Sequence, residues 1–249
     1  STALDAWRGE RDGLPRVGFL GGGSDHVSFL ALCAVPSVAL GARGAPGSAY
    51  HSLYDDLAWY RRIVGNDYAS AALVTRITAV AVDRAAHAPV LLYDLAEPAR
   101  ALGRTARGLG AEHERVLDAK AVAVLVDAAD TQAARATRLE RTLGESVAEL
   151  SDDERRRVRV AQRQLERAWL HEPGLPGRPW YRNLYTAPDE TSGYAAWPLP
   201  GLQKAIHESD AKLGSRQLEL LRQVLVARGA ALDSIESALD RDGSTAPPR

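Results

Sequence analysis

The chain has 249 residues, of which 45% are hydrophobic and 25% charged, an ordinary composition for a globular chain with a sizeable core. Its 31 basic and 32 acidic residues give a net charge of -1, which excludes a strongly basic nucleic-acid binder and an acidic tail protein. The single cysteine, Cys33, excludes an intrachain disulfide framework, and Arg76 interrupts the longest apolar run, near Ala69–Val82, so no transmembrane helix is expected.

The start of the chain suggests that it was cut from something longer. The sequence contains no methionine, and Ser1-Thr2-Ala3-Leu4 has neither the basic nor the apolar segment of a signal peptide. We therefore interpret residue 1 as a cut point, natural or artificial, within a parent protein. The localisation of that parent is left open, and a secreted or periplasmic location is compatible with the sequence.

The first 93 residues combine glycine-rich turns, one strand-like run and alanine-rich helices. Gly21-Gly22-Gly23 predicts a turn into a helix over Asp25–Ala34, with Ser24 or Asp25 as its N-cap. Pro36–Gly41 predicts a short buried strand between a proline and a glycine. Because one short strand cannot form a sheet alone, its partners are expected upstream of this chain.

Two more helices are predicted before the composition changes near Asp94. The first opens at Asp55 and Asp56, where acidic groups favour a helix N-terminus, and ends near Gly65-Asn66. The second runs from about Asp67 to Ala86 and is apolar on most faces, so we expect it to be buried. This half is interpreted as the incomplete end of an α/β domain.

The second half shows clean helical periodicity. Apolar side chains recur every three or four residues over Leu117–Leu143 and Val158–Ala168, and Ser151 and Glu154 have the spacing of a capping box. A last helix presents a packing seam made of Leu218, Leu221, Leu225, Leu232, Ile235 and Leu239. These patterns predict an all-α helical bundle.

A long irregular segment, Glu172–Leu199, separates two of these helices. It is rich in proline, and its aromatic residues are Trp180, Tyr181, Tyr185, Tyr194 and Trp197. A long loop inside a compact domain is usually functional or disordered, and the aromatic content argues against disorder. We therefore expect this segment to be functional.

Several individual residues and short motifs can be interpreted either as functional or as purely structural. His51 follows the predicted strand, where an α/β domain places its site, but a hydrogen-bonded loop histidine is the favoured alternative on this evidence. The turn at Gly21–Gly23 could hold an anion, but a tight turn with a helix cap is favoured. Cys33 is expected to be a buried structural thiol, and the run Arg155–Arg159 a solvated helix face.

Two sets of motifs, one in each half, occur together. The first is Gly23-Ser24-Asp25 followed by Tyr50-His51-Ser52-Leu53-Tyr54-Asp55. The second comprises Leu165–Leu170, Gly174–Asn183, Ala187-Pro188, Tyr194-Ala195 and Pro200–Leu202. Their order and spacing, from about Leu14 to Asp240, resemble the glutamate carboxypeptidase II family, whose members are co-catalytic zinc peptidases that share their architecture with the transferrin receptor.

The resemblance implies a fold, an activity and an assembly. Residues 1–93 would be the C-terminal part of an α/β zinc-peptidase domain and residues 94–249 an all-α helical dimerisation domain, giving a mostly helical chain. The parent would be a zinc exopeptidase with two metal ions, acting on small peptides as a carboxypeptidase, aminopeptidase or dipeptidase and forming a homodimer. The alternative is a non-catalytic interaction protein like the transferrin receptor, and the retained Tyr50-His51-Ser52 argues against it.

The resemblance also assigns residues to the site. His51 corresponds to a zinc ligand, and Tyr50 to a tyrosine beside the substrate. Gly23 and Ser24 correspond to a pair that touches the substrate through a carbonyl and a side chain, and Tyr194 to a tyrosine that reaches the catalytic pocket from the helical domain. The general base and the other zinc ligands are expected upstream, so the chain has no catalytic residue of its own and is expected alone to be inactive and to hold no zinc.

Three positions depart from the glutamate-specific members of the family. Gly193 stands where those members have a lysine that binds the terminal carboxylate of the substrate. Ala39 and Gly41 stand where they have paired arginines. Without these cations the site is not expected to prefer acidic dipeptides.

Overall fold

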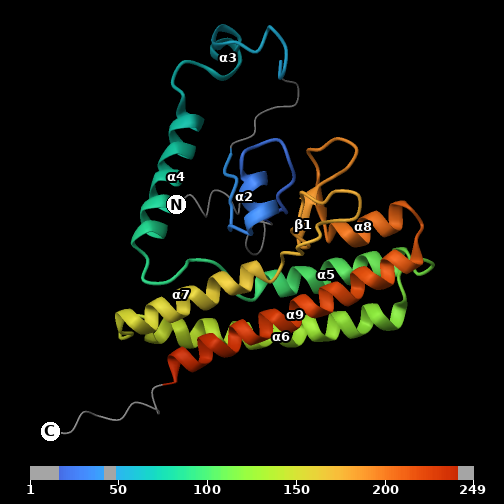
Figure 1. The fold of residues 1–249 in the computed structure, drawn as a ribbon. Coiled ribbons are helices and arrows are strands. Elements are labelled where there is room, and N and C mark those ends of the chain that lie inside the picture. The colour runs from blue at the N-terminus through green and yellow to red at the C-terminus, as the bar shows by residue number, and fades with distance from the viewer. Residues whose placement is uncertain (1–16, 42–48, 241–249) are drawn as a thin grey trace, which may run out of the picture.

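A computed structural model describes residues 17–41 and 49–240 (Figure 1). Its elements are α2 (His26–Cys33), α3 (Leu57–Val64), α4 (Ala69–His87), α5 (Glu97–Glu112), α6 (Ala119–Ser146), α7 (Asp152–Arg167), β1 (Thr186–Pro188), β2 (Ala196–Pro198), α8 (Pro200–His207) and α9 (Ala211–Leu239). The protein is mostly helical with one small sheet, so the predicted fold class is confirmed. Both Ser1–Leu4 and Leu14, where the predicted cut and the family resemblance begin, lie outside the described residues.

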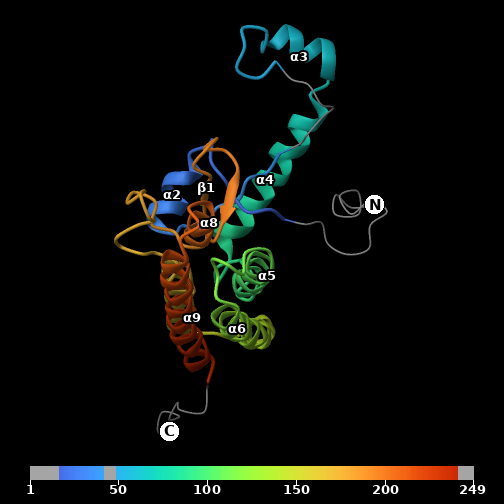
Figure 2. The same cartoon turned by 90° about the vertical axis from the view of Figure 1, so that its right-hand side faces the viewer.

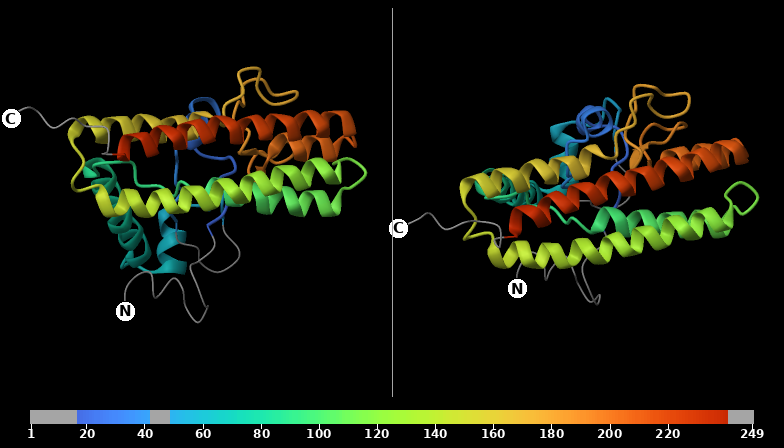
Figure 3. Two further views of the ribbon diagram at one scale, coloured as in Figure 1. Left: turned by 90° about the horizontal axis from the view of Figure 1, so that it is seen from below. Right: turned by 60° about the horizontal axis from the view of Figure 1, so that its bottom comes forward.

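Four long helices, α5, α6, α7 and α9, lie side by side in one bundle (Figures 1 and 3). Side-chain capping hydrogen bonds stabilise the N-termini of two of these helices. The Asp118 carboxylate accepts the Ala121 amide at the start of α6, and the capping box predicted for α7 forms in full between Ser151 and Glu154. None of the helices in the described ranges is both long and apolar enough to span a bilayer.

The predicted packing seam of α9 is confirmed. Its leucines and isoleucine at 218, 221, 225, 232 and 235 are buried, and Leu239 is partly buried. They join two clusters, one toward α8 and one toward the start of α7, which fill the bundle from end to end. The face predicted for α6 is also largely buried, with Ala121 and Ala128 only partly covered. The boundary predicted near Asp94 stays a prediction, although it falls just before α5.

One buried charge interrupts the seam. Arg228, only 1% exposed, donates to the carbonyls of Leu165 at 2.9 Å and Leu95 at 3.0 Å and to the side-chain oxygen of Gln132 at 3.3 Å. The central carbon of its guanidinium lies 5.3 Å from the centroid of the Trp169 ring. A buried guanidinium is tolerated only when its donors are satisfied, and this one ties α9 to α6, α7 and the start of α5.

The strand predicted at Pro36–Gly41 is wrong. The described residues there have no regular secondary structure, and Val38 is 72% exposed. A strand needs a neighbour to accept its backbone hydrogen bonds, and no partner lies beside this segment within the part of the chain that is described. The small sheet is instead the antiparallel pair β1–β2, with Ala187 opposite Trp197, inside the segment predicted to be irregular.

Two burial predictions in the first half are also wrong. The helix predicted from Asp67 forms as α4, but it buries none of its residues and stands away from the bundle (Figures 1 and 2). Cys33 is exposed at the end of α2, which buries only Ala31. Asp25 takes the predicted N-cap position of α2, but its side chain makes no capping hydrogen bond. Apolar periodicity predicts which face of a helix can be buried, but it does not show that another segment packs against that face.

Candidate functional site

The glycine turn before α2, Gly21–Gly23, packs against a loop from the other half of the chain that contains Gly193 and Tyr194. The Gly22 amide donates to the Tyr194 carbonyl at 3.0 Å. A Cβ at Gly21 would overlap that carbonyl, and a Cβ at Gly22 would overlap the carbonyl of Gly193. At Gly23, which has φ +85°, a Cβ would lie 2.6 Å from the Tyr194 ring. Three consecutive glycines are therefore needed for this close approach.

Further contacts fix the same junction, where α2 lies beside β1 (Figures 1 and 2). Three hydrogen bonds run from the hairpin segment to residues before and in α2: Thr186 Oγ1 to the Leu20 carbonyl at 3.0 Å, Asn183 Nδ2 to the Leu30 carbonyl at 3.0 Å and the Arg182 amide to the Ala31 carbonyl at 2.8 Å. The rings of Phe19 and Tyr185 meet at 5.1 Å. The two halves are thus joined through backbone groups as well as side chains.

Tyr50 lies at this junction too. Its phenol shares a hydrogen bond with the phenol of Tyr194, and this bond, followed by partial desolvation and the charges of Tyr194 and Asp55, raises the pKa of Tyr50. The imidazole of His51 stacks on the Tyr50 ring, with centroids 3.7 Å apart. His51 itself adopts the left-handed conformation at φ 60°, which turns the chain sharply after Tyr50.

The structure therefore brings together four of the five residues that the resemblance assigns to the site. Gly23 contacts Tyr194, Tyr194 contacts Tyr50, and Tyr50 contacts His51. Ser24 follows Gly23 on the exposed surface, and its carbonyl accepts the Val27 amide at 3.2 Å as α2 begins. The cluster is built from one tyrosine of each half, with a histidine at its edge.

Sequence reasoning missed the residues that hold this cluster. Asn183, 2% exposed, accepts the Tyr185 amide with its side-chain oxygen while its side-chain nitrogen reaches α2. The sequence predicts a turn at Gly21 and Gly22, and in the structure the backbone of Gly193 and Tyr194 lies directly against it. Three glycines in a row are a signal for close backbone approach, but the sequence does not say which segment approaches.

The described residues do not form a zinc site by themselves. His51 is one imidazole donor, and in the described ranges no three histidine, cysteine, aspartate or glutamate side chains are grouped so that they could hold a metal ion. Catalytic zinc takes about three protein ligands. The described residues alone therefore do not provide enough ligands for the expected binuclear zinc centre.

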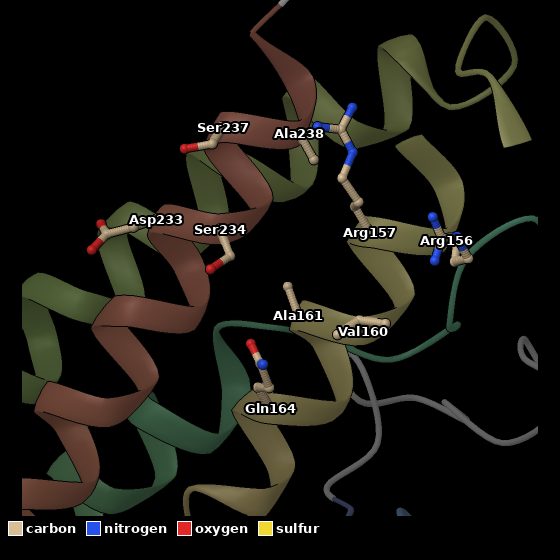
Figure 4. Close-up of a pocket in the computed structure, with 9 residues that line it drawn as sticks. All are labelled: Arg156, Arg157, Val160, Ala161, Gln164, Asp233, Ser234, Ser237 and Ala238. Atoms are coloured by element: carbon tan, nitrogen blue, oxygen red, sulfur yellow. The ribbon is translucent and has the colours of Figure 1, made fainter. Parts of the chain in front are cut away.

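A separate pocket of about 530 Å³ lies between α7 and α9 (Figure 4). It contains none of the predicted site residues. Arg156 and Arg157 at its rim both pair with Asp153, which confirms the prediction of a solvated, charge-balanced helix face. This pocket has no chemistry that connects it with the tyrosine cluster.

In the described residues, the helical bundle carries a hairpin loop that closes onto a glycine turn and a Tyr-His pair. Residues 119–233 match the transferrin receptor-like dimerisation domain family. The chain is 28% identical over 211 residues to a probable glutamate carboxypeptidase, LAMP1, of Arabidopsis thaliana, covering 82% of this chain and 29% of that protein. It is 23% identical over 248 residues to a probable glutamate carboxypeptidase of Arthroderma benhamiae, covering 96% of this chain and 33% of that protein.

These comparisons confirm the predicted resemblance to the C-terminal region of transferrin receptor-like and glutamate carboxypeptidase proteins. The chain spans only 29% and 33% of the lengths of these two curated relatives. The matched region runs from α6 to most of α9, so it includes the loop that carries Tyr194 and leaves out α5.

Proposed function

We propose that this chain is the C-terminal portion of a co-catalytic zinc exopeptidase that hydrolyses small peptides. The observation that carries the proposal is the contact between Tyr194 of the helical half and both Gly23 and Tyr50, beside His51. A receptor-like protein has no need for this combination of a histidine and two tyrosines at the junction. The names of the relatives, both probable glutamate carboxypeptidases, support a peptidase parent.

In this proposal each residue of the cluster has a role. His51 contributes one neutral imidazole to a zinc ion, while Tyr50 and Tyr194 line the peptide site and Gly23 and Ser24 contact the peptide. Bound zinc supplies a Lewis acid for the scissile carbonyl and lowers the pKa of a bound water. Since His51 is a single donor, we propose that the 249-residue chain alone neither holds zinc nor hydrolyses peptides, and that the other ligands and the general base belong to the parent protein.

The substrate preference is proposed from the departures in the sequence. Gly193 has φ +70° and faces open space, so no side chain there meets the terminal carboxylate of a peptide. Ala39 and Gly41 carry no charge. We therefore propose a peptidase that does not select acidic dipeptides, of carboxypeptidase, aminopeptidase or dipeptidase type.

The test is a peptidase assay on the full-length gene product and on the 249-residue chain. We expect the full-length protein to hydrolyse neutral dipeptides, to lose this activity in a chelator and to regain it with zinc, while the 249-residue chain stays inactive throughout. A His51→Ala variant of the full-length protein should lose activity at least as severely as chelation does. Hydrolysis that persists in the chelator, or none at all, would contradict the proposal.

We also propose that the chain self-associates as a homodimer through its helical domain. The matched family is a dimerisation domain, and the bundle leaves Val124 of α6 and Val226 of α9 60% and 63% exposed. Obligate interfaces of this kind bury about 2,000 Å² or more. Sedimentation velocity on residues 94–249, which omit the exposed α4, should show a discrete dimer at micromolar concentration, and a clean monomer would refute this assembly.

A further inference from the structure

One carboxylate closes the loop that carries Tyr194. Asp189 follows β1 and is 9% exposed, and its oxygens accept the amides of Ser192 at 2.7 Å, Ala195 at 3.1 Å and Thr191 at 3.2 Å, as well as the Ser192 hydroxyl at 2.6 Å. These hydrogen bonds, the Ser192 hydroxyl first, lower the pKa of Asp189 to about 2, so the carboxylate is charged at any physiological pH. The loop is therefore closed around an anion that accepts from most of its length.

Ser192 passes this constraint on to Tyr194. Its hydroxyl donates to Asp189 and accepts the Tyr194 amide at 3.1 Å. On the far side of the loop, the Tyr194 carbonyl accepts the Gly22 amide at 3.0 Å. The backbone of Tyr194 is thus held on one side by a relay from Asp189 and on the other by the glycine turn.

The base of the loop is clamped separately. The Glu190 carboxylate pairs with Lys204 of α8 at 2.8 Å and with Arg178 at 3.2 Å, and the three side chains are 23%, 17% and 17% exposed. Arg178 also donates to the Pro188 carbonyl at 2.7 Å. Glu190 therefore fixes the start of the loop. The conformation of the chain from Ser192 to Ala195 is fixed by Asp189.

We propose that Asp189 is a positioning residue that holds Tyr194 in place through Ser192, so that the Tyr194 carbonyl accepts the Gly22 amide and the Tyr194 ring lies against Gly23. The proposal rests on the proposed function only in treating Tyr194 as part of a peptide site. The contacts that hold Tyr194 are all within this chain. Asp189 touches neither the peptide nor a metal in this arrangement. Its effect on the site is transmitted through the Ser192 hydroxyl and the loop backbone.

The test uses the intact 249-residue chain and the ring signal of Tyr194 as its reporter, with tyrosines labelled at the ζ carbon and assigned by single Tyr→Phe variants. Because the Tyr194 ring lies against Gly23, its signal should differ from that of an unstructured tyrosine. Asp189→Ala should move the signal toward the unstructured value, and Asp189→Asn, which keeps the volume and one acceptor oxygen, should give an intermediate shift.

Hydrogen exchange of the Gly22 amide provides a second reading near neutral pH. In Asp189→Ala it should speed up by about tenfold, the size expected when about one net hydrogen bond is lost. The matched control is Asp210→Ala, which removes a carboxylate that accepts the Leu213 amide at the start of α9, away from the loop. That variant should leave both the Tyr194 signal and the Gly22 exchange unchanged.

The outcomes separate this inference from the proposed function. If Asp189→Ala shifts neither the Tyr194 signal nor the Gly22 exchange, the positioning role is refuted. Both readings can respond as expected in a protein whose full-length form hydrolyses no peptide, and that result supports the loop anchor while rejecting the peptidase.

Discussion

Replacing Arg228 with methionine is expected to lower the free energy of unfolding by about 3–5 kcal/mol, the loss typical of breaking a buried charged network. Methionine fills the volume of the arginine stem but donates no hydrogen bond. The carbonyls of Leu95 and Leu165 and the side-chain oxygen of Gln132 then lose a donor in the interior of the bundle. Chemical denaturation of the purified chain measures the difference.

The loss should also depend on pH, because Arg228 faces a second buried charge. Glu166 lies 4.0 Å away and its side chain is 17% exposed. Burial raises the pKa of Glu166 and the arginine lowers it, so removing the arginine should raise this pKa further. A carboxyl whose pKa is higher in the folded than in the unfolded chain stabilises the fold at low pH, and this contribution disappears as pH rises through the folded pKa.

The deficit of Arg228→Met should therefore grow as pH rises, and it should be larger at about pH 8 than at about pH 5. Adding Glu166→Gln should remove this pH dependence and leave the rest of the loss. Arg222→Met is the matched control, since Arg222 is exposed and pairs only locally with Glu219 at 2.7 Å. It should cost no more than about 1 kcal/mol. Equal losses for the two arginine variants would contradict the expectation.

The bundle was predictable because its signals are local. The capping box of Ser151 and Glu154 and the seam from Leu218 to Leu239 are patterns of short spacing, and they formed as predicted. Arg228 shows the limit of such patterns. It sits in the seam of α9, yet a charged residue is normally assigned to the surface, and only its partners in three other segments explain its burial.

In the first half of the chain, the predictions were wrong where the structure depends on contacts with distant segments. The strand at Pro36–Gly41 and the burial of α4 both require neighbouring segments, and neither a strand nor an apolar helix face creates one. The helices α2 and α3 were predicted because their turns and caps are local, such as Asp56, which accepts the Trp59 amide at 2.7 Å.

The site was predictable only through the family resemblance. That resemblance picked out Tyr50, His51 and Tyr194, and the structure brings them together across well over a hundred residues of sequence. Nothing in the residue pattern alone pairs the Tyr194 loop with the glycine turn. The support from Asp189 was likewise invisible, because an aspartate in a loop has many local uses.

Replacing Gly22 with alanine tests that pairing directly. The added Cβ would overlap the Gly193 carbonyl and lie 3.1 Å from the Pro188 Cβ. The first of these is backbone, which cannot swing aside as a long side chain can. We expect a loss of about 1–3 kcal/mol, the range for overpacking a tight contact, and we expect it at the junction because the bundle does not use this contact.

Hydrogen exchange followed by mass spectrometry separates junction from bundle. Gly22→Ala should accelerate exchange in residues 17–31 and 182–196, which hold the hydrogen bonds between the halves, while α6 and α9 keep their protection. Gly108→Ala is the matched control: Gly108 is an exposed residue of α5 whose Cβ would meet open space, so this change should stabilise the helix by about 0.5–1 kcal/mol. If the two alanine variants exchange alike over residues 17–31, the glycine turn is not the seat of the Tyr194 loop. If Gly22→Ala loosens the junction alone, the contact between the hairpin loop and the glycine turn depends on a position where no side chain fits.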